Sequence, residues 1–258
     1  MPYAFGDSDV AAIRLEVVAR VFEPATRPLL RQLEPERRDL AIDLGCGPGF
    51  TTALLAEILR CQRTLGLDLS EEFITRAGRL ASGRIAFRPH DITVLPLPEA
   101  PADLLYSRFL LTHLEDPIRV VAGWATQLPP GGLLVLEEVE SIATSSPVLA
   151  RYLEIVDRML ESQSNRLYLG AELEGAAPPA RVEKRHSGIR ELVVAPSDAA
   201  AMFVLNLHAW RRHPFVRANF TAAEIQRLGR HLRALQAHAD PSVEIVWKLR
   251  QIVYGRGP

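Results

Sequence analysis

Cysteine is scarce in this sequence of 258 residues, which contains only Cys46 and Cys61. The two cysteines show neither a C-x-x-C spacing nor a cluster with histidine. This argues against a disulfide framework and against a structural zinc site. We therefore predict a protein of the reducing cytoplasm that holds no metal.

Long apolar runs and an excess of one charge are also missing. No stretch reaches about 18 uncharged apolar residues, and the opening MPYAFGDSDV lacks the cationic and apolar regions of a signal peptide. Thirty basic and thirty-one acidic residues give a net charge of −1, so no general field draws the chain to nucleic acid or to an anionic membrane. We expect a soluble, unexported protein with neither of these partners.

A length of 258 residues, 48% of them hydrophobic, suits one α/β domain with an appended subdomain. Between residues 38 and 140, short apolar runs alternate with helical patterns, as in βα units that wind a mostly parallel sheet. The runs predict strands at 40–45, 64–69, 84–89, 102–107 and 131–140, and helices at 50–60, 70–80 and 117–128.

The two ends of the chain follow other patterns. Apolar residues from Ile13 to Phe22 recur at helical spacing, which predicts a helix over about 8–22 and a second short helix before Pro35. The later patterns predict a helix at 147–163, a strand at 189–195, helices at 197–212 and 221–237, and a strand at 243–256. Because the last two helices interrupt a strand pair, we expect them to cap the sheet.

The stretch LAIDLGCGPGFTT, residues 40–52, places three glycines at alternate positions directly after a strand. The nicotinamide fingerprint G-x-G-x-x-G would need another glycine where Phe50 or Thr52 stands, which disfavours that cofactor. The strand-end acid Asp43 suits a ligand with an ammonium group and no pyrophosphate. Glycines let such a ligand approach the backbone, and the following helix N-terminus favours its carboxylate. S-adenosylmethionine combines these features.

At this point "DLGCGPG" resembles the first motif of the class I S-adenosylmethionine-dependent methyltransferases. The resemblance implies an α/β, doubly wound, Rossmann-like and mostly parallel seven-stranded sheet. Together with the pattern of elements along the chain, it predicts a helical lid at 1–37, a cofactor-binding core at 38–196, a helical cap at 197–240 and a final core strand at 241–258. In this motif the expected cofactor-binding residues are Asp43, Gly45, Cys46, Gly47 and Gly49.

Two later motifs extend the resemblance. TLGLDLS ends its strand in Asp68, which would accept both ribose hydroxyls, with Leu69 against the adenine ring. FRPHDIT carries Asp91, which in this family accepts from the adenine amino group, with Ile92 near the ring. A helix cap at the first acid and an ordinary loop acid at the second remain open.

Two further segments carry expected cofactor contacts. In YSRFLLTHLEDP, Ser107 and Arg108 occupy the place that lies beneath the reactive methyl in the family. Arg108 departs from the small amide of many relatives, and it could turn to an acidic substrate or to the cofactor carboxylate. In YAFGDSDVAAIRLE, Tyr3 could touch the cofactor or the acceptor and Arg14 could hold a carboxylate, or both could belong to a frayed, solvated terminus.

His113 is our candidate base, because a histidine with a pKa near neutrality can remove a proton from the acceptor. A packing or capping histidine is the alternative. On the cap segment AMFVLNLHAWRR, the candidate substrate-binding residues are Asn206, His208 and Trp210.

The sequence thus predicts a methyltransferase that uses S-adenosylmethionine on a small molecule in a secondary-metabolite pathway. A cyclisation or rearrangement that retains the methyl group, a nicotinamide-dependent oxidoreductase and a non-catalytic sensor are the alternatives. A homodimer remains open.

Overall fold

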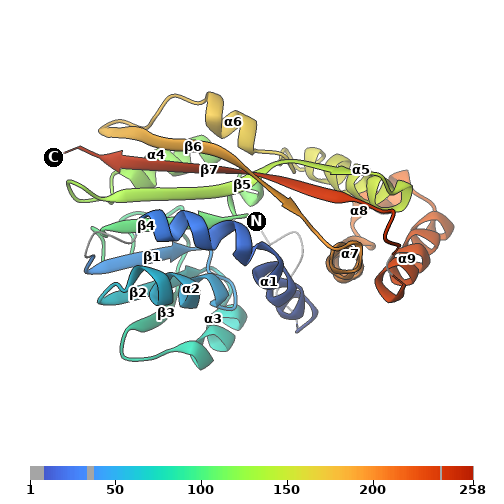
Figure 1. Cartoon of the computed structure of the whole chain (residues 1–258), viewed down its shortest axis with the longest axis horizontal. Helices are drawn as coiled ribbons and strands as arrows, with labels where there is room; N and C mark the ends of the chain where they lie inside the picture. Colours follow the sequence, from blue (N-terminus) through green and yellow to red (C-terminus); the bar gives the residue numbers. More distant parts are fainter. Residues whose placement is uncertain (1–8, 34–37, 239, 258) are drawn as a thin grey trace.

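The computed structural model describes residues 9–33, 38–238 and 240–257. Its centre is one seven-stranded sheet in the order β3-β2-β1-β4-β5-β7-β6 (Figure 1). The strands are β1 (Leu40–Leu44), β2 (Arg63–Asp68), β3 (Ile85–Pro89), β4 (Leu104–Arg108), β5 (Leu133–Thr144), β6 (Val182–Val193) and β7 (Ile245–Arg256). β1 to β5 pair in parallel, whereas β7 runs antiparallel to both β5 and β6. The predicted doubly wound, mostly parallel α/β sheet is confirmed.

Helices cover both faces of the parallel part of the sheet, as its continuous apolar strands require. One face carries α1 (Asp9–Gln32) and α2 (Phe50–Leu59), whose Leu30 and Leu55 are buried against the strands. The other face carries α4 (Pro117–Ala125) and α6 (Gly170–Gly175), with Trp124 fully buried. α3 (Glu71–Ala77) packs beside β2 and β3.

The first helix differs from its prediction. Instead of a helix over about 8–22 and a second short one, α1 continues to Gln32 with Pro24 and Pro28 inside it. A proline inside a helix removes one helical hydrogen bond, so packing must compensate for both of them. The apolar residues beyond residue 22, among them Ala25 and Leu29, are buried, and this packing keeps the helix in one piece.

Four helices gather at one end of the molecule (Figure 1). They are α5 (Pro147–Glu161), α7 (Pro196–Trp210), α8 (Pro214–Asn219) and α9 (Ala222–Ala237). One apolar cluster joins them to α1 and β7: it includes Phe22, Tyr152, Phe203, Leu232 and Trp247. Helix α5, which precedes β6, therefore shares one apolar cluster with α7, α8 and α9, which follow it. The division of the chain into a cofactor-binding core and a helical cap remains a prediction. The short helices α6 and α8 were not predicted.

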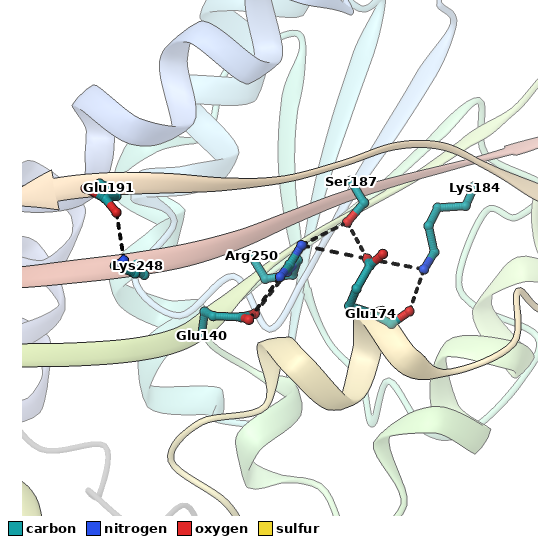
Figure 2. Close-up of polar contacts among 7 residues, drawn as sticks. All are labelled: Glu140, Glu174, Lys184, Ser187, Glu191, Lys248 and Arg250. Carbon is teal, nitrogen blue, oxygen red and sulfur yellow. Dashed lines mark hydrogen bonds and ion pairs between the residues drawn. The ribbon is translucent and has the colours of Figure 1, made fainter.

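The antiparallel edge is longer than predicted: β6 begins at Val182, not at 189. Most residues of this edge strand are exposed, and the exposed residues occur on both faces of the strand. Its sequence therefore lacks the alternation that identifies a half-buried strand. Figure 2 shows polar contacts at this edge, where Arg250 on β7 donates from Nε to Glu140 Oε2 on β5 over 2.9 Å. Glu174 on α6 forms an ion pair with Lys184 on β6 over 3.2 Å.

Within the described ranges, no helix combines the length and the apolar character needed to cross a bilayer. The same ranges hold no group of three or more histidine, cysteine, aspartate or glutamate side chains placed to bind a metal ion.

Candidate functional site

A cavity of about 530 Å³ opens at the carboxyl ends of β1, β2 and β4. This is the edge where parallel α/β sheets bind ligands, and the volume lies in the usual range for small-molecule sites. We call the side formed by Gly45, Cys46, Gly47, Asp68, Leu69, Asp91 and Ile92 the glycine-loop half. We call the side formed by Arg14, Phe22, Ile142, Tyr152, Val156, Met202, Phe203, Asn206 and Trp247, from α1, β5, α5, α7 and β7, the helical half.

The glycines after β1 are required by the backbone and by close packing. Gly45, Gly47 and Gly49 have φ angles of +69°, +52° and +89°, a region that side chains disfavour. A Cβ on Gly45 would lie 2.7 Å from Leu110 Cδ1. Gly45 and Gly47 line the cavity, whereas Gly49 forms the N-cap of α2 without a side-chain cap. The loop therefore presents backbone without side chains to the cavity at Gly45 and Gly47.

Asp43 supports this loop from within the protein. It is 1% exposed and its Oδ2 accepts from the hydroxyls of Thr51, at 2.6 Å, and Thr52, at 2.7 Å. Burial raises the pKa of Asp43 to about 6, although the two threonine hydrogen bonds oppose that rise. Asp43 does not line the cavity, so its contact with a ligand's ammonium group remains a prediction.

Asp68 lies at the tip of β2 and fixes the loop while facing the cavity. Its Oδ2 accepts from the Gly47 amide at 2.8 Å, and its Oδ1 accepts from the Ser70 amide at 2.9 Å. Beside it, Leu69 lines the cavity and is 63% exposed. An apolar ring bound in the cavity could cover this exposed leucine side chain. Asp91 and Ile92 line the same half. The structure thus brings four predicted residues together, and the N-cap of α3 is the neighbouring Ser70.

Arg108 projects from the end of β4 into the cavity and is held by a buried network. Its Nη1 donates to Thr26 Oγ1 over 2.9 Å, and Thr26 in turn donates to Glu137 Oε2 over 2.7 Å. Tyr106 also donates to Glu137 Oε2, and Gln251 donates to Glu137 Oε1 over 2.6 Å. α1, β4, β5 and β7 are therefore linked behind the guanidinium.

Ser107 is fully buried and does not line the cavity, so its contact with the cofactor remains a prediction. Its Oγ has no hydrogen-bond partner among the described residues. Tyr3 lies outside the described residues.

The helical half is apolar except for a few polar groups near α1. Arg14 is 6% exposed and its Nη1 donates to Asn206 Oδ1 over 3.1 Å, which joins a predicted cofactor residue to a predicted substrate residue. Burial raises the pKa of the neighbouring Tyr152 to about 12. His208 is exposed and Trp210 is buried in the apolar cluster, and neither lines the cavity. Of the three predicted substrate residues, only Asn206 faces it.

His113 lines the cavity from η2 (Leu111–His113), the short helix after β4. Burial, together with the charge of Arg14, lowers its pKa to about 3. The imidazole is therefore neutral at physiological pH, and it is a weaker proton acceptor than an ordinary histidine.

Glu138 on β5 also lines the cavity and was not predicted as a site residue. The side chain is 1% exposed, and burial raises its pKa to about 8. Two adjacent acids at the end of an apolar strand, Glu137 and Glu138, were the available signal, because a buried carboxyl needs a reason to be there. The sequence did not show which of the two faces a cavity.

Comparison with known families adds a direct finding. Residues 42–136 match the family model described as a methyltransferase domain. This range starts within β1 and ends within β5, so it includes the glycine loop and every residue of the glycine-loop half.

The chain resembles curated proteins over part of their length. It is 34% identical to the O-methyltransferase cnsE of Penicillium expansum over 57% of this chain and 55% of that protein. It is 35% identical to a trans-aconitate 2-methyltransferase of Methylobacterium radiotolerans over 51% of each chain. The chain thus spans about half the length of these relatives.

Among solved structures, a protein of Bacillus halodurans assigned as a methyltransferase superposes with a TM-score of 0.61. The match has 13% identity and covers 91% of this chain and all of the other. At that identity the likeness concerns the fold.

Proposed function

The chain belongs to the class I S-adenosylmethionine-dependent methyltransferases through its domain at residues 42–136, and from this premise we propose that it methylates a small molecule held in the helical half of the cavity. The cofactor S-adenosylmethionine, when bound, supplies a methyl group on a positively charged sulfur. The chain's own task is to hold donor and acceptor in line and to exclude water, which provides much of the acceleration in such displacements.

The glycine-loop half fits this cofactor by its chemistry. Asp68 offers carboxylate oxygens to two ribose hydroxyls, and the exposed Leu69 offers an apolar surface for an adenine ring. Gly45 and Gly47 line the cavity without side chains, so a nucleoside can approach the backbone there. The nicotinamide fingerprint would need a third glycine where Phe50 or Thr52 stands, which disfavours a nicotinamide dinucleotide here.

Arg108 is positioned to bind a carboxylate. Its guanidinium is held from behind by Thr26 while facing the cavity, and a guanidinium pairs well with the planar carboxylate of an amino acid. Asp91 and Ile92 complete the proposed cofactor contacts at the adenine end, and Asp43 holds Thr51 and Thr52 behind the glycine loop.

The helical half suits an acceptor with a largely apolar body. Phe22, Phe203 and Trp247 supply the apolar walls, and Arg14 with Asn206 supplies a buried cation and an amide. A buried guanidinium favours an acceptor that also carries an anionic group. The names of the relatives, an O-methyltransferase and trans-aconitate methyltransferases, agree with a small acceptor, and a place in secondary metabolism remains a prediction.

His113 is proposed to orient the acceptor rather than to carry its proton away. A neutral imidazole can accept a hydrogen bond from an acceptor hydroxyl. Its lowered pKa makes complete proton transfer to it unfavourable at neutral pH.

The observation that carries this proposal is one cavity whose two halves meet: the glycine loop with Asp68 on one side, and an apolar wall on the other. The test is the release of S-adenosylhomocysteine from S-adenosylmethionine in the presence of apolar carboxylic acids and phenols of increasing size. We expect release with acceptors that the helical half can hold, and its loss in Asp68→Ala but not in Asp240→Ala, an exposed acid outside this cavity.

The same assay separates the alternatives. A rearrangement that retains the methyl group would convert its substrate without releasing S-adenosylhomocysteine. Cofactor binding without product of any kind would indicate a sensor, and either result would contradict methyl transfer.

A further inference from the structure

The two carboxyl oxygens of Glu138 differ in their contacts: one accepts hydrogen bonds from the backbone and the other does not. Its Oε1 accepts from the backbone amides of Leu110, at 2.9 Å, and Leu111, at 2.8 Å. Within the described part of the chain, no group donates to Oε2. Because the side chain lines the cavity, Oε2 is the oxygen that a cavity occupant can reach.

The neighbouring glutamates of β5 differ from it. Glu137 is fully buried, receives hydrogen bonds on both oxygens and does not line the cavity. Glu140 is bonded by both of its oxygens to Arg250, on the α6 side of the sheet (Figure 2). Of these three acids, Glu138 alone offers an oxygen to the cavity. The two amide hydrogen bonds fix the direction in which that oxygen points.

The same hydrogen bonds place Glu138 at the junction of the two halves. Leu110, which it holds, packs over Gly45 in the glycine loop, and the Leu110 carbonyl accepts from the His113 amide over 2.9 Å. A group that faces the cavity from this position can meet the acceptor atom next to the cofactor half.

Methylation of a hydroxyl or of a neutral amine with a hydrogen forms a bond from that atom to carbon and leaves the electron pair of the broken carbon–sulfur bond on sulfur. The acceptor's proton must leave in the same process. We propose that Glu138 makes a hydrogen bond from Oε2 to this acceptor group and takes up the released proton. This assignment rests on the proposed methyltransferase function and defines its acceptor as an O–H or N–H compound.

The electrostatics support Glu138 over His113 for this role. Burial raises the pKa of Glu138 to about 8, with a further rise from the charge of Glu137, and the two amides oppose the shift. Burial lowers the pKa of His113 to about 3. A proton acceptor works best when its pKa lies near the working pH, so the carboxyl is the better match. The other charged or titratable side chains on the cavity wall are Arg14, Asp68, Asp91 and Arg108, with Cys46 and Tyr152.

The test is carboxyl labelling of the full chain with dicyclohexylcarbodiimide, an apolar reagent that reacts with protonated carboxyls, followed by peptide mass spectrometry. We expect Glu138 to be labelled at pH 7, with labelling falling as the pH rises through about 8. Glu137 and Glu140 serve as internal controls in the same peptide, and both should stay unlabelled. Absence of label on Glu138, or equal label on Glu137, would overturn the assignment.

A second readout uses Glu138→Gln, which keeps an oxygen for the two amides, against Glu140→Gln outside the cavity. With an acceptor that the wild type methylates, Glu138→Gln should lower kcat by roughly 100-fold or more and abolish the rise of rate with pH, whereas Glu140→Gln should change neither. An unaltered kcat and pH profile in Glu138→Gln would refute proton uptake there. Calorimetric titration with S-adenosylhomocysteine reports on the proposed function separately, because failure of Glu138 alone leaves that binding intact.

Discussion

Replacing Thr26 by valine tests the network that links α1 to the cavity. Thr26 is fully buried, and its hydroxyl both donates to Glu137 over 2.7 Å and accepts from Arg108 over 2.9 Å. Valine has nearly the same shape, so the change removes these two hydrogen bonds and little else. A hydrogen bond to a charged group contributes about 1.5–3 kcal/mol. Arg108 can recruit water from the cavity, so we expect a net loss of about 2–4 kcal/mol.

The assay is urea unfolding followed by circular dichroism, with the free energy of unfolding extrapolated to water. A loss of this size also lowers Tm by roughly 5–10 °C in a domain of this length. Thr26→Ser, which keeps the hydroxyl, should recover most of the loss. Thr75→Val is the matched control, because the exposed Thr75 hydroxyl only bonds the Glu71 carbonyl, and its effect should stay within about 0.5 kcal/mol. If Thr26→Val were as stable as this control, the network would not hold α1 to the sheet.

Three further changes test separate parts of the account. Gly66→Ala should lower the free energy of unfolding by about 1–3 kcal/mol, because its Cβ would lie 2.6 Å from Phe87 Cδ1, whereas Gly83→Ala, with no atom within 4 Å, should be nearly neutral in the same urea assay. Glu138→Gln should gain stability relative to wild type as the pH rises from about 5 to about 9. In the wild type the native carboxyl keeps a proton that the unfolded chain releases, so the stability of the wild type falls over that pH range. Curves of Tm against pH that run parallel for the two proteins would contradict the raised pKa of Glu138. His113→Ala should reduce kcat while leaving the calorimetric affinity for S-adenosylhomocysteine unchanged, and a weakened affinity would place His113 in the cofactor contacts instead.

Elements whose signals are local could be predicted from the sequence. β1 and its glycine turn could be predicted because the strand, the acid and the three glycines are adjacent in the chain. The length of α1 could not, since the burial that carries it past Pro24 comes from helix α2 and the sheet. The start of β6 was hidden because an edge strand exposed on both faces shows no alternation.

Site residues at the ends of strands could be predicted from the sequence. Site residues on helices and within strands were harder to predict, because the sequence does not show which way their side chains face. Asp68 and Asp91 reach the cavity because Asp68 ends one parallel strand and Asp91 lies just past the end of the next. On α7, Asn206 faces the cavity and His208 does not, since two residues correspond to about 200° of helical rotation and the sequence does not give the helix's orientation. Glu138 was missed because the sequence does not show which face of its strand points to the cavity, and a shift of one residue exchanges the two faces.

The central claim, that an adenosyl cofactor lies between the glycine loop and Asp68, is tested most directly by calorimetric titration with S-adenosylhomocysteine. The account predicts saturable binding to the wild type, at least tenfold weaker binding to Asp68→Ala because its ribose contacts at about 1.5–3 kcal/mol each are lost, and unchanged binding to Asp240→Ala. It also predicts no heat with NAD. Equal affinity in Asp68→Ala and wild type, or heat with NAD alone, would contradict it.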